Sequence, residues 1–169
     1  MLFIFERGRL QCGLDLLRYH SFDQIMDIPE YTTQEQVMFF DTDCAGVVNN
    51  IAYLRMVETC RTHLGARMGM DFSSMETTML YPVVVSTEIN YLIPAKLGDK
   101  LTIHGKLDQL ERVRFWCSFS MTREGEERPL IKCRQSLAMV HVERGKPGRP
   151  IRLPAQWAEQ WGDALKSST

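Results

Sequence analysis

The sequence lacks any apolar run that approaches the roughly 18 residues of a membrane-spanning helix. Its first apolar stretch, residues 2–5, ends at Glu6 and Arg7 and has no basic residues before it, so we expect no signal peptide. The five cysteines are scattered and include no CxxC pair, which argues against a zinc framework and a disulfide scaffold. Reduced thiols are typical of a cytoplasm, which is the location that we expect.

An excess of charge of either sign is also missing. The chain has 20 Lys and Arg against 21 Asp and Glu, a net charge of −1, so bulk charge predicts neither nucleic acid nor an anionic membrane as a partner. There is no internal repeat and no low-complexity linker. The 44% of hydrophobic residues and 24% of charged residues instead indicate a globular chain, long enough for one domain with a core.

Hydrophobic patterning predicts a strand, a long helix and then four more strands. The first strand is predicted over residues 31–40, and the helix from about Asn50 to His63 or Leu64, ended by Gly65. The helix is apolar around most of its circumference, so we expect the sheet to enclose it. The later strands are predicted over residues 80–93, 101–107, 113–121 and 130–142. Consecutive hairpin-connected strands favour an α+β fold, an antiparallel sheet curled around one central helix.

Three segments follow from this pattern. Residues 1–30 form an N-terminal extension of uncertain structure, in which Met26 is an alternative start of translation. Residues 31–145 form the domain, with a short helical piece expected at residues 72–75. Residues 146–169 form a tail that begins with a loop up to Pro150 and carries a short helix.

One stretch, residues 41–50, brings two carboxylates next to the start of the helix. Asn49 or Asn50 can cap that helix, while the free N–H groups of its first turn carry the positive end of the helix dipole. A carboxylate from Asp41 or Asp43 beside these groups can act on a substrate whose oxygen they bind. The alternative is a turn before an ordinary capped helix, since Asp and Asn are common in turns.

Two motifs decide between these alternatives by resemblance. Residues 41–50 read Asp-Thr-Asp-Cys-Ala-Gly-Val-Val-Asn-Asn, and Tyr53, Glu58 and Arg61 follow in the helix. Residues 91–95 read Tyr-Leu-Ile-Pro-Ala, and a Gly-Asp turn follows at residues 98–99. Both resemble the 4-hydroxybenzoyl-CoA thioesterase-like family, whose members have the hotdog fold, and the resemblance covers residues 33–143.

The resemblance implies a role for several residues. Asp43 falls on the catalytic carboxylate, the backbone N–H at Asn50 on the donor to the thioester oxygen, and Gly46 on the residue that shapes the loop. Close relatives often carry Tyr-His or Trp-Tyr where this chain has Asn49 and Asn50, but a backbone donor does not depend on its side chain. The substrate is expected to contact Val48, Asn49, Tyr53 and Glu58.

The remaining candidates have ordinary interpretations. Asp41 is expected to hold the loop by hydrogen bonds, and Glu58 to pair with Arg55 or Arg61 around the helix. The four histidines show no metal spacing, so neither a metal nor a cofactor is expected. Cys44 has no histidine or cation near it in sequence and is predicted to be a small filler residue.

The predicted function is therefore an acyl-CoA thioesterase that hydrolyses its substrate to a free acid and CoA, with Asp43 as general base or nucleophile. Alternatives are an acyl-ACP or aromatic-CoA thioesterase, and a non-catalytic module that binds acyl-CoA. An exposed sheet edge predicts a homodimer or homotetramer, and the family's sites lie at the subunit interface.

Overall fold

The computed structural model describes residues 27–143 and 145–167; most of the predicted N-terminal extension, with Met26, lies outside the described residues. The strands are β1 (Glu30–Gln36), β2 (Leu80–Tyr91), β3 (Lys100–Leu110), β4 (Arg114–Arg123), β5 (Pro129–His141) and β6 (Arg149–Pro150). The helices are the short 3₁₀ helix η1 (Phe39–Asp41), α1 (Asn50–Arg67), α2 (Phe72–Thr78) and α3 (Ala155–Ser167).

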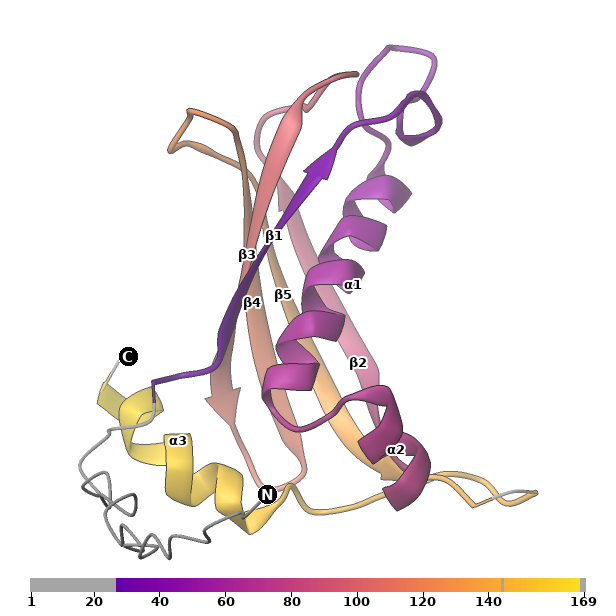
Figure 1. The fold of residues 1–169 in the computed structure, drawn as a ribbon, viewed down its shortest axis with the longest axis vertical. Coiled ribbons are helices and arrows are strands. Elements are labelled where there is room, and N and C mark those ends of the chain that lie inside the picture. The colour runs from indigo at the N-terminus through magenta and orange to yellow at the C-terminus, as the bar shows by residue number, and fades with distance from the viewer. Residues whose placement is uncertain (1–26, 144, 168–169) are drawn as a thin grey trace, which may run out of the picture.

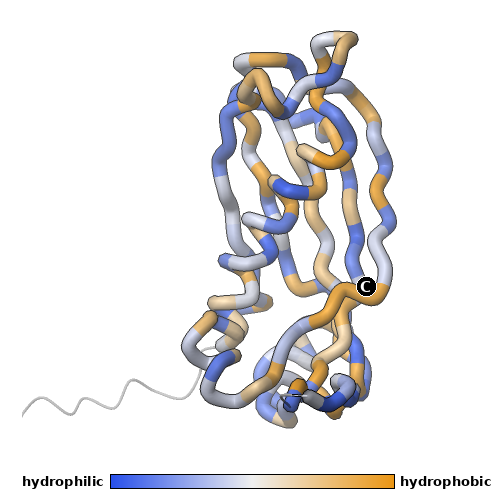
Figure 2. Tube along the Cα trace, turned by 90° about the vertical axis from the view of Figure 1, so that its right-hand side faces the viewer, coloured by the Kyte–Doolittle hydropathy of each residue, from blue (hydrophilic) through white to orange (hydrophobic). Residues whose placement is uncertain are grey.

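The main strands form one antiparallel sheet in the order β1-β3-β4-β5-β2, which curls around α1 (Figure 1). Hydrophilic and hydrophobic residues alternate along the strands (Figure 2), as expected for a sheet with one face turned to a core. That core is built around fully buried side chains such as Met56 of α1, Ile103 of β3 and Met121 of β4. The predicted α+β fold is confirmed.

Helix α1 extends beyond the predicted end at Gly65, so the assignment of Gly65 as the residue after the helix was wrong. The residue with the left-handed conformation is Gly69, at φ +82°. Its N–H donates to Ala66 O at 3.1 Å, and the N–H of Met70 donates to Gly65 O at 2.8 Å. This pair of bonds is a Schellman motif, in which a glycine after the helix satisfies the last carbonyl groups.

One face of α1 remains open in the chain by itself, against the expectation that the sheet would enclose the helix. Ile51 is 73% exposed, and Glu58 and Arg67 also lie at the surface, while Tyr53, Met56 and Cys60 are buried against the sheet. The apolar pattern of the helix therefore predicted more burial than the sheet of this single chain provides.

The first strand also ends earlier than predicted. β1 stops at Gln36, and Phe39–Asp41 turn into η1 because the Met38 N–H donates to Asp41 Oδ2 at 2.9 Å. Val37 is buried, whereas Phe39 and Phe40 are 81% and 73% exposed. An apolar run that resembles a strand thus places two aromatic rings at the surface next to the start of α1.

Two further details differ from the predicted strands. The pairing register between β2 and β5 shifts between Val84 and Ser86, which leaves Val85 as a bulge. Val84 therefore lies opposite buried Leu137, and Ile89 lies opposite buried Cys133, so the bulge interrupts the simple alternation of faces along β2. The loop predicted to run to Pro150 includes the short strand β6, which pairs with the end of β5.

Helix α3 closes one end of the sheet (Figure 1). Its side chains Trp157, Trp161 and Leu165 are buried, and the Trp157 ring meets Phe115 of β4 edge-on at 5.3 Å between centroids. The helix in the predicted tail therefore contributes to the same core as the sheet.

Candidate active site

The loop before α1 is a tight turn with Asp43 at its start. The Asp43 N–H donates to Val47 O at 2.9 Å, and the Gly46 N–H donates to Asp43 O at 3.0 Å. Gly46 has φ +73°, a conformation that favours glycine. Asp43 Oδ1 accepts a hydrogen bond from the Ala45 N–H at 2.8 Å, which orients the exposed carboxylate.

Asp41 holds this loop together from the inside, as predicted. The side chain is buried, and besides Met38 it meets Arg55 of α1, whose Nη2 lies 3.2 Å from Asp41 Oδ1. The Asp41 carbonyl accepts from both the backbone N–H and the side-chain Nδ2 of Asn49, at 2.9 and 2.8 Å. With its own groups engaged in this way, Asp41 has a structural role.

The start of α1 presents free backbone donors. Asn49 is the capping residue, since its Oδ1 accepts from the Ala52 N–H at 2.9 Å. Over the part of the chain that the structure describes, no protein group accepts from the N–H groups of Asn50 and Ile51. These two donors lie at the positive end of the helix dipole and can bind a partly negative oxygen. Sequence reasoning had singled out only the first of them.

The second motif is tied to the first by backbone hydrogen bonds. The Val48 N–H donates to Ala95 O at 2.9 Å, and the Ala95 N–H donates to the Tyr53 hydroxyl oxygen at 2.8 Å. Val47 also forms an isolated antiparallel bridge with Lys96. Burial raises the pKa of the Tyr53 hydroxyl, which is therefore a neutral anchor for the strand end.

A cavity of about 260 Å³ lies where these segments meet. Its lining includes three expected site residues, Val48, Asn50 and Tyr53, together with Tyr91, Leu92, Ile93 and Pro94. Leu92 and Ile93 were not predicted as site residues, although their position in the second motif could have indicated them.

Glu58 does not line this cavity. It is exposed and pairs with Arg61 at 3.1 Å, one of its two expected partners. The side chain of Asn49 caps α1 by accepting from the Ala52 N–H, and Asn49 does not line the cavity.

No set of three His, Cys, Asp or Glu side chains in the described ranges is arranged to hold a metal ion. His63 instead stacks on Tyr31 with 5.0 Å between ring centroids, and His104 lies 3.1 Å from Glu30.

Cysteine reactivity provides a first test of this arrangement. Cys44 is exposed, whereas burial raises the pKa of Cys117 to about 12 and that of Cys133 to about 11. Because only thiolates react readily with iodoacetamide, we expect Cys44 to be alkylated first among the described cysteines at pH 8, and buried Cys117 and Cys133 to react only on unfolding. Peptide mass spectrometry over time checks this order. Fast labelling of Cys117 in the folded protein would contradict the described core.

Comparisons with known proteins show the family and the fold of the chain. A profile of the Thioesterase-like superfamily matches residues 37–161. The 1,4-dihydroxy-2-naphthoyl-CoA hydrolase of Thermosynechococcus vestitus is 28% identical over 123 residues, 72% of this chain and 84% of that protein. The long-chain acyl-CoA thioesterase FadM of Escherichia coli is 38% identical over 78 residues, 46% of this chain and 58% of that protein.

Solved structures resemble the chain over most of its length. The 4-hydroxybenzoyl-CoA thioesterase of Pseudomonas sp. strain CBS-3 has a TM-score of 0.70 at 21% identity, covering 78% of this chain and 99% of that one. A probable thioesterase of Bartonella henselae has a TM-score of 0.65 at 28% identity, covering 74% and 99%. The likeness confirms the predicted hotdog fold. None of the described helices has the length and apolarity needed to cross a membrane.

Proposed function

The chain belongs to the thioesterase-like superfamily, and from that membership we propose that it hydrolyses an acyl-CoA thioester with Asp43 as the catalytic carboxylate. The observation that carries the proposal is the pairing of an oriented, exposed carboxylate with the free N–H groups of Asn50 and Ile51 at the helix terminus. In this proposal Asp43 activates the attacking group and the N–H groups bind the oxyanion, and Asn50 lines the 260 Å³ cavity.

The proposed reaction begins with the thioester carbonyl oxygen on the helix N–H groups. As general base, Asp43 takes a proton from water while the water oxygen bonds to the carbonyl carbon; the carbon–sulfur bond then breaks and CoA leaves with the proton. As nucleophile, Asp43 itself displaces CoA to form a mixed anhydride, which water hydrolyses to the free acid. Both routes give the same products and use the same oxyanion site.

A homodimer would complete this site. Val83, Val84 and Val85 in the edge strand β2 are between 37% and 47% exposed, and Phe39, Phe40 and Ile51 are exposed near the loop. The other edge, β1, carries Glu, Thr and Gln residues, which suit water. Because apolar sheet edges are usually paired or covered, we propose that two copies join through β2 into one continuous sheet. A tetramer would need a further interface.

The direct test is release of free CoA from a panel of aliphatic and aromatic acyl-CoA thioesters, each compared with the matching acyl-ACP. The proposal expects turnover of at least one CoA thioester by the purified chain without added metal. If no thioester is hydrolysed, the chain is a binding module and the proposed chemistry is wrong. The described cysteines, all free thiols, support a reducing compartment such as the cytoplasm as the place of this reaction.

Asn49 and Asn50 should respond differently to truncation. Asn50→Ala should keep most activity, because the proposed donor is its backbone N–H, while Asn49→Ala removes the cap and should destabilise the protein by about 1 kcal/mol. Urea unfolding and the CoA-release assay, applied to both variants, measure the two effects separately. A loss of more than about a thousandfold in Asn50→Ala exceeds the usual effect of one donor and would assign the role to its side chain.

A further inference from the structure

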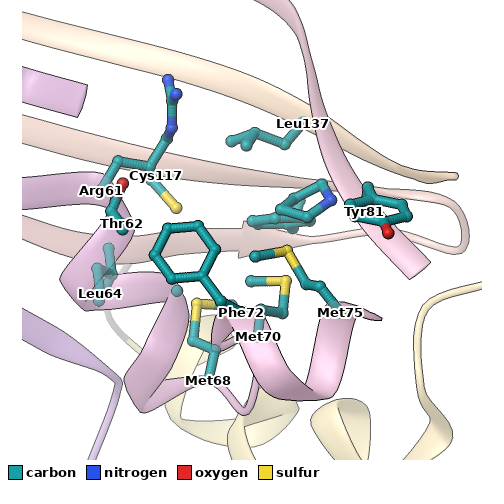
Figure 3. Close-up of a pocket in the computed structure, with 13 residues that line it drawn as sticks. Arg61, Thr62, Leu64, Met68, Met70, Phe72, Met75, Tyr81, Cys117 and Leu137 are labelled. Carbon is teal, nitrogen blue, oxygen red and sulfur yellow. The ribbon is translucent and has the colours of Figure 1, made fainter. Parts of the chain in front are cut away.

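A second cavity, of about 160 Å³, lies at the opposite end of α1 from the Asp43 loop, between α1, α2 and the sheet. In Figure 3 the side chains of Met68, Met70 and Met75 gather on its helical side, with Leu137 and Tyr81 on the sheet side. Unbranched methionine side chains adapt to irregular contents, so these walls suit a flexible ligand. A ring or a chain of about six carbons fits a cavity of this size, since a cavity of about 150 Å³ admits benzene.

Two of the polar side chains at this cavity, Arg61 and Thr62, are already engaged, and the Thr62 hydroxyl donates to Glu58 O at 2.9 Å. Arg61 donates from Nη1 to Gln135 at 2.9 Å and lies 3.1 Å from Glu58, and Figure 3 shows its guanidinium directed away from the methionines. The neutral thiol of Cys117 adds a weakly polar surface. A charged group buried among the methionines would lose its hydrogen bonds to water without replacement. The cavity therefore favours plain hydrocarbon.

Within one chain this cavity is remote from Asp43. Arg61 is its lining residue closest in sequence to Asn50, and it lies about 16 Å further along the helix. Strand β2 connects the same two ends: Tyr81 and Pro82 line this cavity, whereas Tyr91 lines the cavity beside Asn50. Two β2 edges paired about a twofold axis run antiparallel, so the end of one strand lies beside the start of the other. In the proposed dimer, the loop of one subunit would therefore lie towards the 160 Å³ cavity of its partner.

We propose that this cavity binds the hydrocarbon end of an unbranched aliphatic acyl group whose thioester is held at the partner subunit's Asp43. The inference rests on the proposed function and adds to it the class of acyl group.

Gly65→Leu tests the proposal by filling the cavity. Gly65 lines it, and an added Cβ would stand 3.8 Å from Met70, an ordinary contact. Gly65→Leu should lower kcat/KM for dodecanoyl-CoA by tenfold or more and leave butanoyl-CoA within about twofold, since each methylene in an apolar pocket is worth roughly tenfold or more. Gly162→Leu, a glycine in α3 with open space around it, is the matched control and should leave both values unchanged.

Met70→Ala enlarges the same cavity and should shift the preference towards longer chains, which tests the proposal independently of how well Gly65→Leu folds. If the wild type hydrolyses aromatic thioesters alone, or if both variants change all chain lengths equally, the inference is overturned while the proposed thioesterase function stands. If the wild type hydrolyses no thioester, the proposed function itself fails.

Subunit mixing tests the contribution of the partner. Asp43→Asn lacks the carboxylate, and Gly65→Leu lacks the open cavity, so neither alone should hydrolyse dodecanoyl-CoA well. In mixed dimers the intact carboxylate of one chain meets the open cavity of the other. A statistical mixture has about half heterodimers with one good site of two, so roughly a quarter of the wild-type rate should return. No recovery after verified subunit exchange would place carboxylate and cavity in one chain.

Discussion

Asp43→Asn lowers the rate of thioester hydrolysis by about 10²- to 10⁴-fold, the range expected when a general base is removed. The replacement is nearly isosteric, and the new amide oxygen can still accept from the Ala45 N–H that orients the native carboxylate. The turn is therefore retained while the basic and nucleophilic oxygen is lost. Single-turnover and steady-state CoA release, with circular dichroism to verify folding, measure the effect.

Asp108→Asn is the matched control for this substitution. Asp108 lies in β3, pairs with Arg134 at 2.6 Å and takes no part in the lining of either cavity described above. Its replacement should leave the rate within about twofold, because a partly exposed ion pair contributes little. Full activity in Asp43→Asn would assign the chemistry to another group, with the enzyme class unchanged.

Val85→Glu should separate the subunits of the proposed dimer and, with them, the proposed composite active site. Val85 is 47% exposed near the middle of β2, where a twofold axis would bring it close to its own copy. Two like charges there repel and oppose edge pairing. We expect a monomer by light scattering and a loss of activity above about tenfold at low enzyme concentration, partly recovered at high concentration by mass action.

Gln34→Glu places the same charge on the other edge of the sheet, in β1, at an exposed position. This control should remain a dimer with full activity, because β1 is the polar edge. If Val85→Glu remains a dimer, the subunits join through another surface. If it becomes a fully active monomer, the Asp43 site is complete within one chain.

The local pattern of residues 41–50 predicted most of the loop. An Asp-rich turn, a glycine and an asparagine cap depend on contacts within a few residues, so neighbouring sequence contains the necessary information. The structure places Asn49 in the cap and gives Gly46 its positive φ. The catalytic role of Asp43 was predicted by resemblance, and it stays a prediction until the variants above are measured.

The wrongly predicted ends of β1 and α1 have a different cause. β1 ends at Gln36 because the side chain of Asp41 binds the Met38 N–H, and α1 passes Gly65 because Gly69 and Met70 close its end. The bulge at Val85 interrupts the alternation of faces along β2. Each feature depends on one specific hydrogen bond or register shift that hydrophobic periodicity does not encode.

The sequence by itself determined the order of strands and helix, the α+β class and the capped helix behind Asp43, because these follow from periodicity and short-range hydrogen bonding. Only the tertiary structure decided that the Ala95 backbone joins Tyr53 to Val48, and that α1 separates two cavities at opposite ends of β2. The Ala95 hydrogen bonds connect residues more than forty positions apart. They arise because a curled antiparallel sheet brings distant strand ends to the two ends of one helix.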